Sequence, residues 1–161
     1  MTAQQEDTTQ GGGAPSTDEA YLLIAKIKPG QADALREALT YGATIMGNPE
    51  SALSQVGTVH FARFAILDEE TLLFASHFDG NAEAYLDDFY TFTQGESFDV
   101  VFRYCEGWPG PHDREGFMKF WKSNRVMDFI IYARFPGVTC KQIEKALRIR
   151  DNMEAVLEDF Q

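Results

Sequence analysis

The side chains that most often carry out chemistry in proteins are few in this chain and widely spaced. It has three histidines, His60, His77 and His112, and two cysteines, Cys105 and Cys140. The histidines do not follow the spacing of an HExxH motif, and the cysteines form no CxxC pair. The sequence therefore predicts neither a metal site nor a redox dithiol, and it indicates two reduced, partly buried thiols.

Motifs for nucleophilic catalysis and for nucleotide binding are also missing from the sequence. The chain contains no GxSxG nucleophile elbow, no P-loop and no GxGxxG turn. His77 and Asp79 remain as candidates for a catalytic role, close together just ahead of Gly80. Each also has a structural interpretation, because a strand histidine often only packs and an Asp before Gly is typical of a turn or a helix N-cap.

A second group of polar side chains points to ligand binding. It consists of Lys26, Arg63, Tyr132 and Arg134, which alternate with apolar residues in strand-like runs. Their parity predicts that they lie on the sheet face that the helices leave open, and His77 joins them if the hairpin loop has three residues. Apolar walls with a few cationic groups suit a hydrophobic ligand that carries a carboxylate. The same face could instead pack against a second subunit.

The elements that must position these residues follow from hydrophobic periodicity. Apolar runs bounded by turn residues predict four strands, at residues 21–27, 58–67, 71–78 and 126–135. Helical spacing predicts helices over residues 35–46 and 82–92, and two shorter ones over 98–105 and 113–123. Thr139 and Gln142 form a capping box that opens a long last helix.

This order of elements predicts an α+β fold of the ferredoxin-like βαββαβ type. Its four-stranded sheet is antiparallel, with a helical insertion before the last strand and a long C-terminal helix after it. Residues 1–18 contain no large apolar side chain after Met1, so they are expected to form a disordered tail. Residues 19–161 are expected to form one domain.

The net charge limits the kinds of partner that the chain can bind, and its hydropathy indicates where it is located. The net charge is −11, from 25 acidic and 14 basic residues, which disfavours nucleic acid and anionic membrane surfaces as partners. No apolar run approaches the roughly 18 residues of a membrane span, and no signal peptide is evident. A cytoplasmic protein is therefore expected.

The element order over residues 20–135, and above all the strand–hairpin–helix block at residues 60–89, resembles the dimeric α/β-barrel superfamily of ferredoxin-like proteins. Many bacterial members of this superfamily are of uncharacterised function. Others are antibiotic-type monooxygenases, haem-degrading enzymes, chlorite dismutases and dye-decolorising peroxidases. The resemblance implies a homodimer in which two sheets pack face to face, with a site inside each protomer.

The peroxidase branch of that superfamily carries a GxxDG motif in which the Asp serves peroxide chemistry. Here Ser76, His77, Phe78, Asp79 and Gly80 form SxxDG, which lacks the first glycine. No histidine matches the branch's proximal ligand, although a single imidazole can ligate haem iron. The resemblance therefore leaves haem open as a cofactor.

The sequence leaves three possible functions open. The first is a dimeric small-molecule-binding protein with an apolar pocket on the open sheet face. The second is a cofactor-light monooxygenase or a haem- or peroxidase-like enzyme. The third is a structural dimerisation or accessory domain that uses its last helix as an arm.

Overall fold

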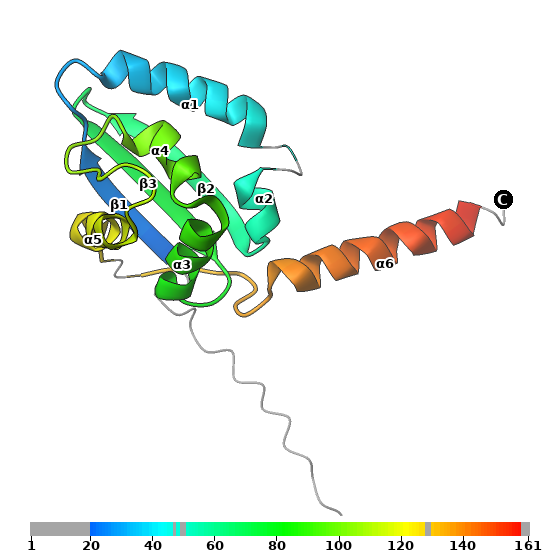
Figure 1. Cartoon of the computed structure of the whole chain (residues 1–161). Helices are drawn as coiled ribbons and strands as arrows, with labels where there is room; N and C mark the ends of the chain where they lie inside the picture. The colour runs from blue at the N-terminus through cyan, green and yellow to red at the C-terminus, as the bar shows by residue number, and fades with distance from the viewer. Residues whose placement is uncertain (1–19, 47, 49–50, 128–129, 159–161) are drawn as a thin grey trace, which may run out of the picture.

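The structure is a computed structural model that describes residues 20–46, 48, 51–127 and 130–158 (Figure 1). The predicted tail, residues 1–18, lies outside this part of the chain. The described strands are β1 (Ala20–Lys26), β2 (Val59–Leu67), β3 (Thr71–Phe78) and β4 (Arg125–Val126). The described helices are α1 (Ala32–Met46), α2 (Ala52–Val56), α3 (Ala82–Thr93), α4 (Glu96–Phe102), α5 (Arg114–Asn124) and α6 (Cys140–Glu158).

The four strands form one antiparallel sheet in the order β2-β3-β1-β4. This confirms the α+β class and the four-stranded antiparallel sheet, and it is compatible with a ferredoxin-like fold. In the β2–β3 hairpin, Leu67 lies opposite Thr71, so the loop has three residues. Phe61 consequently lies opposite His77, and His77 shares the open face with Phe61 and Arg63, as the parity of the two strands requires.

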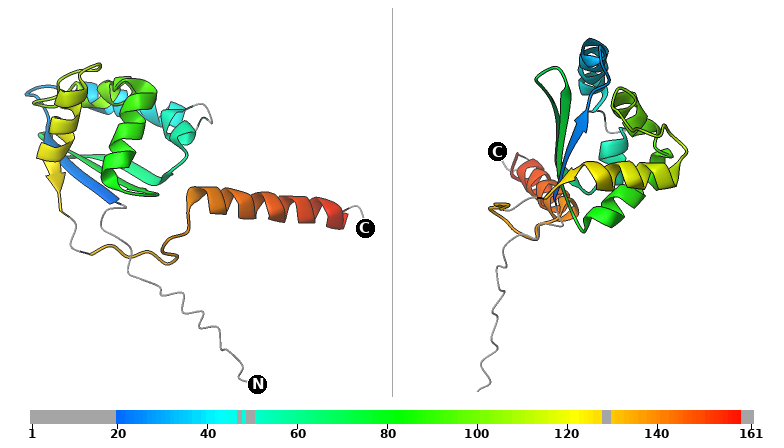
Figure 2. Two further views of the ribbon diagram at one scale, coloured as in Figure 1. Left: turned by 60° about the horizontal axis from the view of Figure 1, so that its bottom comes forward. Right: turned by 90° about the vertical axis from the view of Figure 1, so that its left-hand side faces the viewer.

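Helices cover the other face of the sheet (Figure 2). From Tyr21 onward the buried residues of β1 alternate, with Tyr21, Leu23 and Ala25 on the covered side. They pack with side chains from β3, α1, α3, α4 and α5 in a single core. The open side of the sheet carries Leu22, Ile24 and other apolar residues that no described helix covers.

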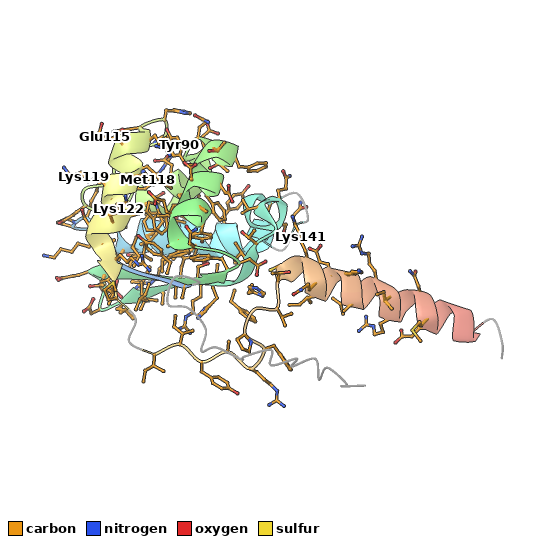
Figure 3. All side chains as sticks on the ribbon, turned by 90° about the horizontal axis from the view of Figure 1, so that it is seen from below. Tyr90, Glu115, Met118, Lys119, Lys122 and Lys141 are labelled. Carbon is orange, nitrogen blue, oxygen red and sulfur yellow. The ribbon has the colours of Figure 1, made fainter. Side chains whose placement is uncertain are left out.

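The predicted insertion, now α4 and α5, forms a large part of this core. Trp121 of α5 is fully buried and its ring lies 4.9–5.3 Å from the rings of Tyr21, Phe74, Phe98 and Phe102. Such edge-on aromatic contacts stabilise beyond the burial of their area. On the outer side of α5, Glu115, Lys119 and Lys122 project away from the sheet (Figure 3). The insertion is therefore part of the layer of helices that packs on the sheet.

The predicted fourth strand is wrong over most of its length. Only Arg125 and Val126 pair with β1, and residues 130–137 form no strand. In a strand over residues 126–135, Met127 and Phe135 would alternate with Tyr132 and Arg134 and face the helices, but they are 66% and 69% exposed. Phe129, which would face the same side, lies outside the described residues.

The register explains why β4 is short. Arg125 enters the sheet opposite Leu23 and runs antiparallel to β1, so it heads toward the described start of β1 at Ala20. In that direction the described part of β1 holds only Tyr21 and Ala20. The chain then leaves the sheet and runs to the open end of the β2–β3 hairpin, opposite the hairpin loop, where α6 begins (Figure 1).

Two smaller features complete the fold. The short helix α2 was not predicted; it begins at Ser51, whose side chain caps Ser54 N–H, and ends at Gly57 with φ of 67°. Within the described part of the chain, every helix is too short or too polar to cross a bilayer.

Candidate functional site

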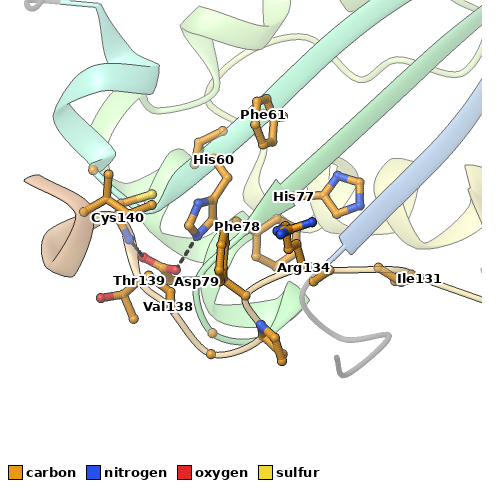
Figure 4. Close-up of a pocket in the computed structure, with 18 of the residues that line it drawn as sticks. His60, Phe61, His77, Phe78, Asp79, Ile131, Arg134, Val138, Thr139 and Cys140 are labelled. Carbon is orange, nitrogen blue, oxygen red and sulfur yellow. Dashed lines mark hydrogen bonds and ion pairs between the residues drawn. The ribbon is translucent and has the colours of Figure 1, made fainter. Parts of the chain in front are cut away.

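A cavity of about 900 Å³ lies where the chain returns from β4 to the hairpin (Figure 4). One wall is formed by the start of β2 and the end of β3, including Phe61 and His77. The other wall is the segment 131–140 with the first turn of α6, including Ile131 and Ile143. The site thus joins elements that are far apart in the sequence.

A turn and a helix cap determine the path of the chain in the second wall. Gly137 adopts a φ of 75°, which favours glycine and lets the chain turn after Pro136. Thr139 N–H donates to Gln142 Oε1 at 2.9 Å, and Gln142 N–H donates to Thr139 Oγ1 at 3.3 Å. These reciprocal bonds confirm the predicted capping box, and they begin α6 beside the hairpin.

Asp79 ties the two walls together. Its Oδ1 accepts a hydrogen bond from His60 Nε2 at 2.7 Å, and its Oδ2 accepts the Cys140 backbone N–H at 2.9 Å. Its own N–H donates to the Thr58 carbonyl at 2.8 Å. The side chains of His60 and Asp79 are only 21% and 18% exposed, so water competes weakly for these bonds. One carboxylate therefore links β2, the end of β3 and the N-terminus of α6.

The Cys140 thiol sits in the same cluster. Burial, followed by the negative charge of Asp79 and a hydrogen bond to it, raises the pKa of Cys140 to about 11. A thiol with that pKa stays protonated at neutral pH, and the thiolate is the nucleophilic form. In this arrangement Cys140 is therefore not an activated nucleophile.

Of the two structural interpretations of Asp79, the helix N-cap is wrong, whereas Asp79 and Gly80 do form a bend after β3, with Gly80 at φ of 91°. The N-cap of α3 is Asn81, whose Oδ1 accepts the Ala84 N–H at 2.9 Å. Ser76, the first residue of the SxxDG pattern, is buried and accepts a hydrogen bond from the Tyr85 hydroxyl at 3.1 Å. The Asp79 side chain therefore does not cap α3, and its hydrogen bonds go to His60 and Cys140 at the cavity.

The predicted ligand-binding residues do not form one cluster. Tyr132 and Arg134 line the cavity, together with His77 and Asp79, although they belong to an irregular segment instead of a strand. Lys26 and Arg63 are not part of its lining.

The register shows how far apart these groups are. Lys26 pairs with Thr71, whereas His77 pairs with Ala20 at the other end of β1. Six residues of strand separate the two positions, about 20 Å at 3.3 Å per residue. Arg63 lies two residues along β2 from Phe61 on the open face. Lys26 therefore cannot share a small ligand with Arg134.

The haem alternative requires an imidazole directed into a buried apolar slot. His60 has its Nε2 bonded to the Asp79 carboxylate, and His77 is exposed on the open sheet face. Neither histidine fits that requirement, so the residues of this cavity do not suit haem.

Sequence reasoning missed the convergence of His60, Asp79 and Cys140. A ring nitrogen, a carboxylate oxygen and the Sγ of these residues all lie within 4.8 Å of one another. Their separations in the chain are 19 and 61 residues, so no local spacing marks them as a set. The prediction of no metal site depended only on the spacing of residues along the chain. It could not detect a cluster whose members become neighbours only in the folded structure.

Comparison with known proteins gives no relative from which to transfer a role. The chain matches no family model, no curated protein and no solved structure.

Proposed function

We propose that this chain is a small-molecule-binding protein of ferredoxin-like fold, and that its ligand is a hydrophobic molecule with an anionic group. The observation that carries the proposal is the chemistry of the cavity. Phe61, Ile131 and Ile143 give it apolar walls, and Arg134 and His77 stand at its edge. Its volume of about 900 Å³ falls within the range of roughly 300–1,000 Å³ typical of small-molecule sites.

Arg134 is the group best placed to hold the anion. Its guanidinium lies 5.7 Å from the centre of the Phe135 ring and forms no ion pair with a described residue. A guanidinium offers two parallel N–H donors, which match a carboxylate or a sulfonate. The acidic residues of the site, Asp79 and Glu144, lie on the α6 side of the cavity, so the anion is expected at the Arg134 side.

Anilinonaphthalene sulfonate tests this proposal, because it combines apolar rings with one anionic group and fluoresces in apolar sites. Arg134→Gln should weaken its binding about tenfold, since a charge-assisted hydrogen bond contributes roughly 1.5 kcal/mol. Arg148→Gln, at an exposed position of α6 outside the cavity, is the matched control and should bind like the wild type. Ile131→Trp should block binding by filling the cavity. Equal binding by all four proteins would contradict the proposal.

A second candidate function, dimerisation through the open sheet face and α6, rests on a different observation. Every described side chain of α6 from Lys141 to Glu154 is exposed, and the helix projects away from the domain (Figures 1 and 2). The exposed residues include Ile143, Leu147, Ile149 and Met153. Amphipathic helices gain most of their stability from packing this kind of apolar face.

We infer that the partner of these surfaces is a second copy of the chain. The open sheet face presents Ile24, Phe61 and Leu67, all exposed, without a cover from any described element. A second copy supplies both an apolar sheet face and an apolar helix, so each α6 can pack on the other protomer. Exposed large apolar residues on one sheet face and on one helix are typical of an association surface.

A reducing location such as the cytoplasm is part of the same proposal. Cys105 and Cys140 are both free thiols, and Cys105 is completely buried in the core. Free buried thiols persist where the compartment is reducing.

A further inference from the structure

Three different donor types meet at the inner end of the cavity. His60 supplies an imidazole nitrogen from β2, Asp79 a carboxylate oxygen from the end of β3, and Cys140 a sulfur from the start of α6. All three residues are partly buried, and all three line the cavity. Figure 4 shows their side chains directed toward one another.

We propose that His60, Asp79 and Cys140 bind a divalent transition-metal ion, zinc by the nature of the donors, with an open coordination position toward the cavity. One nitrogen, one oxygen and one sulfur are donors that zinc accepts in tetrahedral sites. Magnesium and calcium prefer oxygen ligands, and a single carboxylate beside a thiol does not serve them.

The distances fit this ion after a small adjustment. Zinc–ligand bonds of about 2.0–2.3 Å at tetrahedral angles place the donor atoms roughly 3.3–3.6 Å apart. The three donors already lie within 4.8 Å of one another. His60 Nε2 and Asp79 Oδ1 are closer, at 2.7 Å, because a proton joins them. The ion would take the place of that proton and move the two atoms apart by about half an ångström. The imidazole proton would then sit on Nδ1, and Cys140 would release its thiol proton to solvent as the sulfur binds.

The surroundings hold the donors in place before an ion arrives. The Cys140 N–H fixes Asp79 Oδ2, which leaves Oδ1 turned toward His60. Hydrogen bonds of this kind orient ligating carboxylates in metal sites. Glu144, one helical turn after Cys140, adds a second negative charge near the thiol. A divalent cation would offset both charges.

Three protein donors leave one position of a tetrahedral ion free. That pattern is typical of zinc sites that bind water or a substrate. Because each donor residue also lines the cavity, the free position faces the space proposed for the ligand. Metal binding is nevertheless a separate property, and the metal alone tests it.

Cobalt(II) is the probe, because tetrahedral cobalt has visible bands and a cobalt–thiolate bond absorbs in the near ultraviolet. The full chain, freed of metal by a chelator, is titrated with Co²⁺ and then with Zn²⁺. We expect one cobalt per chain with both signals, and loss of both as zinc displaces it. Cys140→Ser should lose the near-ultraviolet band, and His60→Gln should weaken binding by more than tenfold.

Matched controls use the same residue types elsewhere in the chain. Cys105→Ala and His112→Gln should bind cobalt like the wild type, and circular dichroism establishes that each variant is folded. Arg134→Gln should also bind cobalt normally, which separates this proposal from that of the anionic ligand. Absence of the thiolate band in the wild type, or its survival in Cys140→Ser, would overturn the proposal.

Discussion

Replacing Asp79 with alanine should release the start of α6 from the hairpin while the core stays folded. The variant removes the acceptor of two hydrogen bonds, from His60 Nε2 and from the Cys140 N–H. Bonds to a charged group contribute roughly 1.5–3 kcal/mol each, and the lower value applies here because the carboxylate is not fully buried. Only the Cys140 bond joins α6 to the hairpin, because His60 belongs to β2, so the expected loss in the docking of this segment is about 1.5 kcal/mol.

Hydrogen exchange measured by mass spectrometry gives the local readout. A loss of about 1.5 kcal/mol corresponds to roughly tenfold faster exchange in peptides that cover residues 138–144. Global unfolding in urea should change less, because no described residue of α6 belongs to the buried core. Chelator in every sample keeps metal out of the comparison.

Asp87→Ala is the matched control for this experiment. Asp87 also forms an ion pair, with Arg114, but the two side chains are 46% and 59% exposed. Pairs at such positions contribute about 0–1 kcal/mol. If the two variants showed the same exchange over residues 138–144, Asp79 would not hold α6 and the reasoning about the site would fail.

Two further predictions concern association and pH. Ile149→Asp combined with Met153→Asp should convert a dimer to monomers in light scattering, whereas Arg148→Asp on the opposite face of α6 should leave it intact. A dimer that survives the double change would contradict the role of α6 in association. Unfolding free energy should fall as the pH rises above about 9, because burial raises the pKa of Cys105 to about 12 and the unfolded chain releases that proton first. Tyr21, with its pKa also raised to about 12 by burial, adds to the loss above pH 10. Cys140, with its pKa raised to about 11, contributes from about pH 9 as well, so Cys105→Ala should make the fall shallower without moving its onset; an unchanged profile in urea unfolding would contradict this assignment.

The parts of the fold that depend on local pattern could be predicted from the sequence. Apolar runs bounded by turn residues identified β1, β2 and β3. The capping box located the start of α6, whereas the sequence left the hairpin register open and the structure supplied it. Each predicted feature depends on residues within one turn or one strand.

Features that depend on distant parts of the chain could not be predicted. Residues 126–135 have the alternation of a strand, but their pairing depends on where α5 delivers the chain to β1. Because residues 130–137 leave the sheet, Tyr132 and Arg134 line the cavity, whereas Lys26 on β1 does not. The meeting of His60, Asp79 and Cys140 has the same origin, since three elements must be placed before these side chains become neighbours.

The position of Asp79 connects the cavity, the metal site and the arm in one physical argument. Its carboxylate is the hydrogen-bonded anchor of α6 at Cys140, whereas the rest of that helix, as far as it is described, is exposed. An ion held by His60, Asp79 and Cys140 would replace hydrogen bonds with coordinate bonds at this anchor and so reduce the freedom of α6. A helix with less freedom loses less entropy when it packs on a second copy. Occupancy of the metal site and association of two chains should therefore favour each other, and by linkage the effect must be equal in both directions.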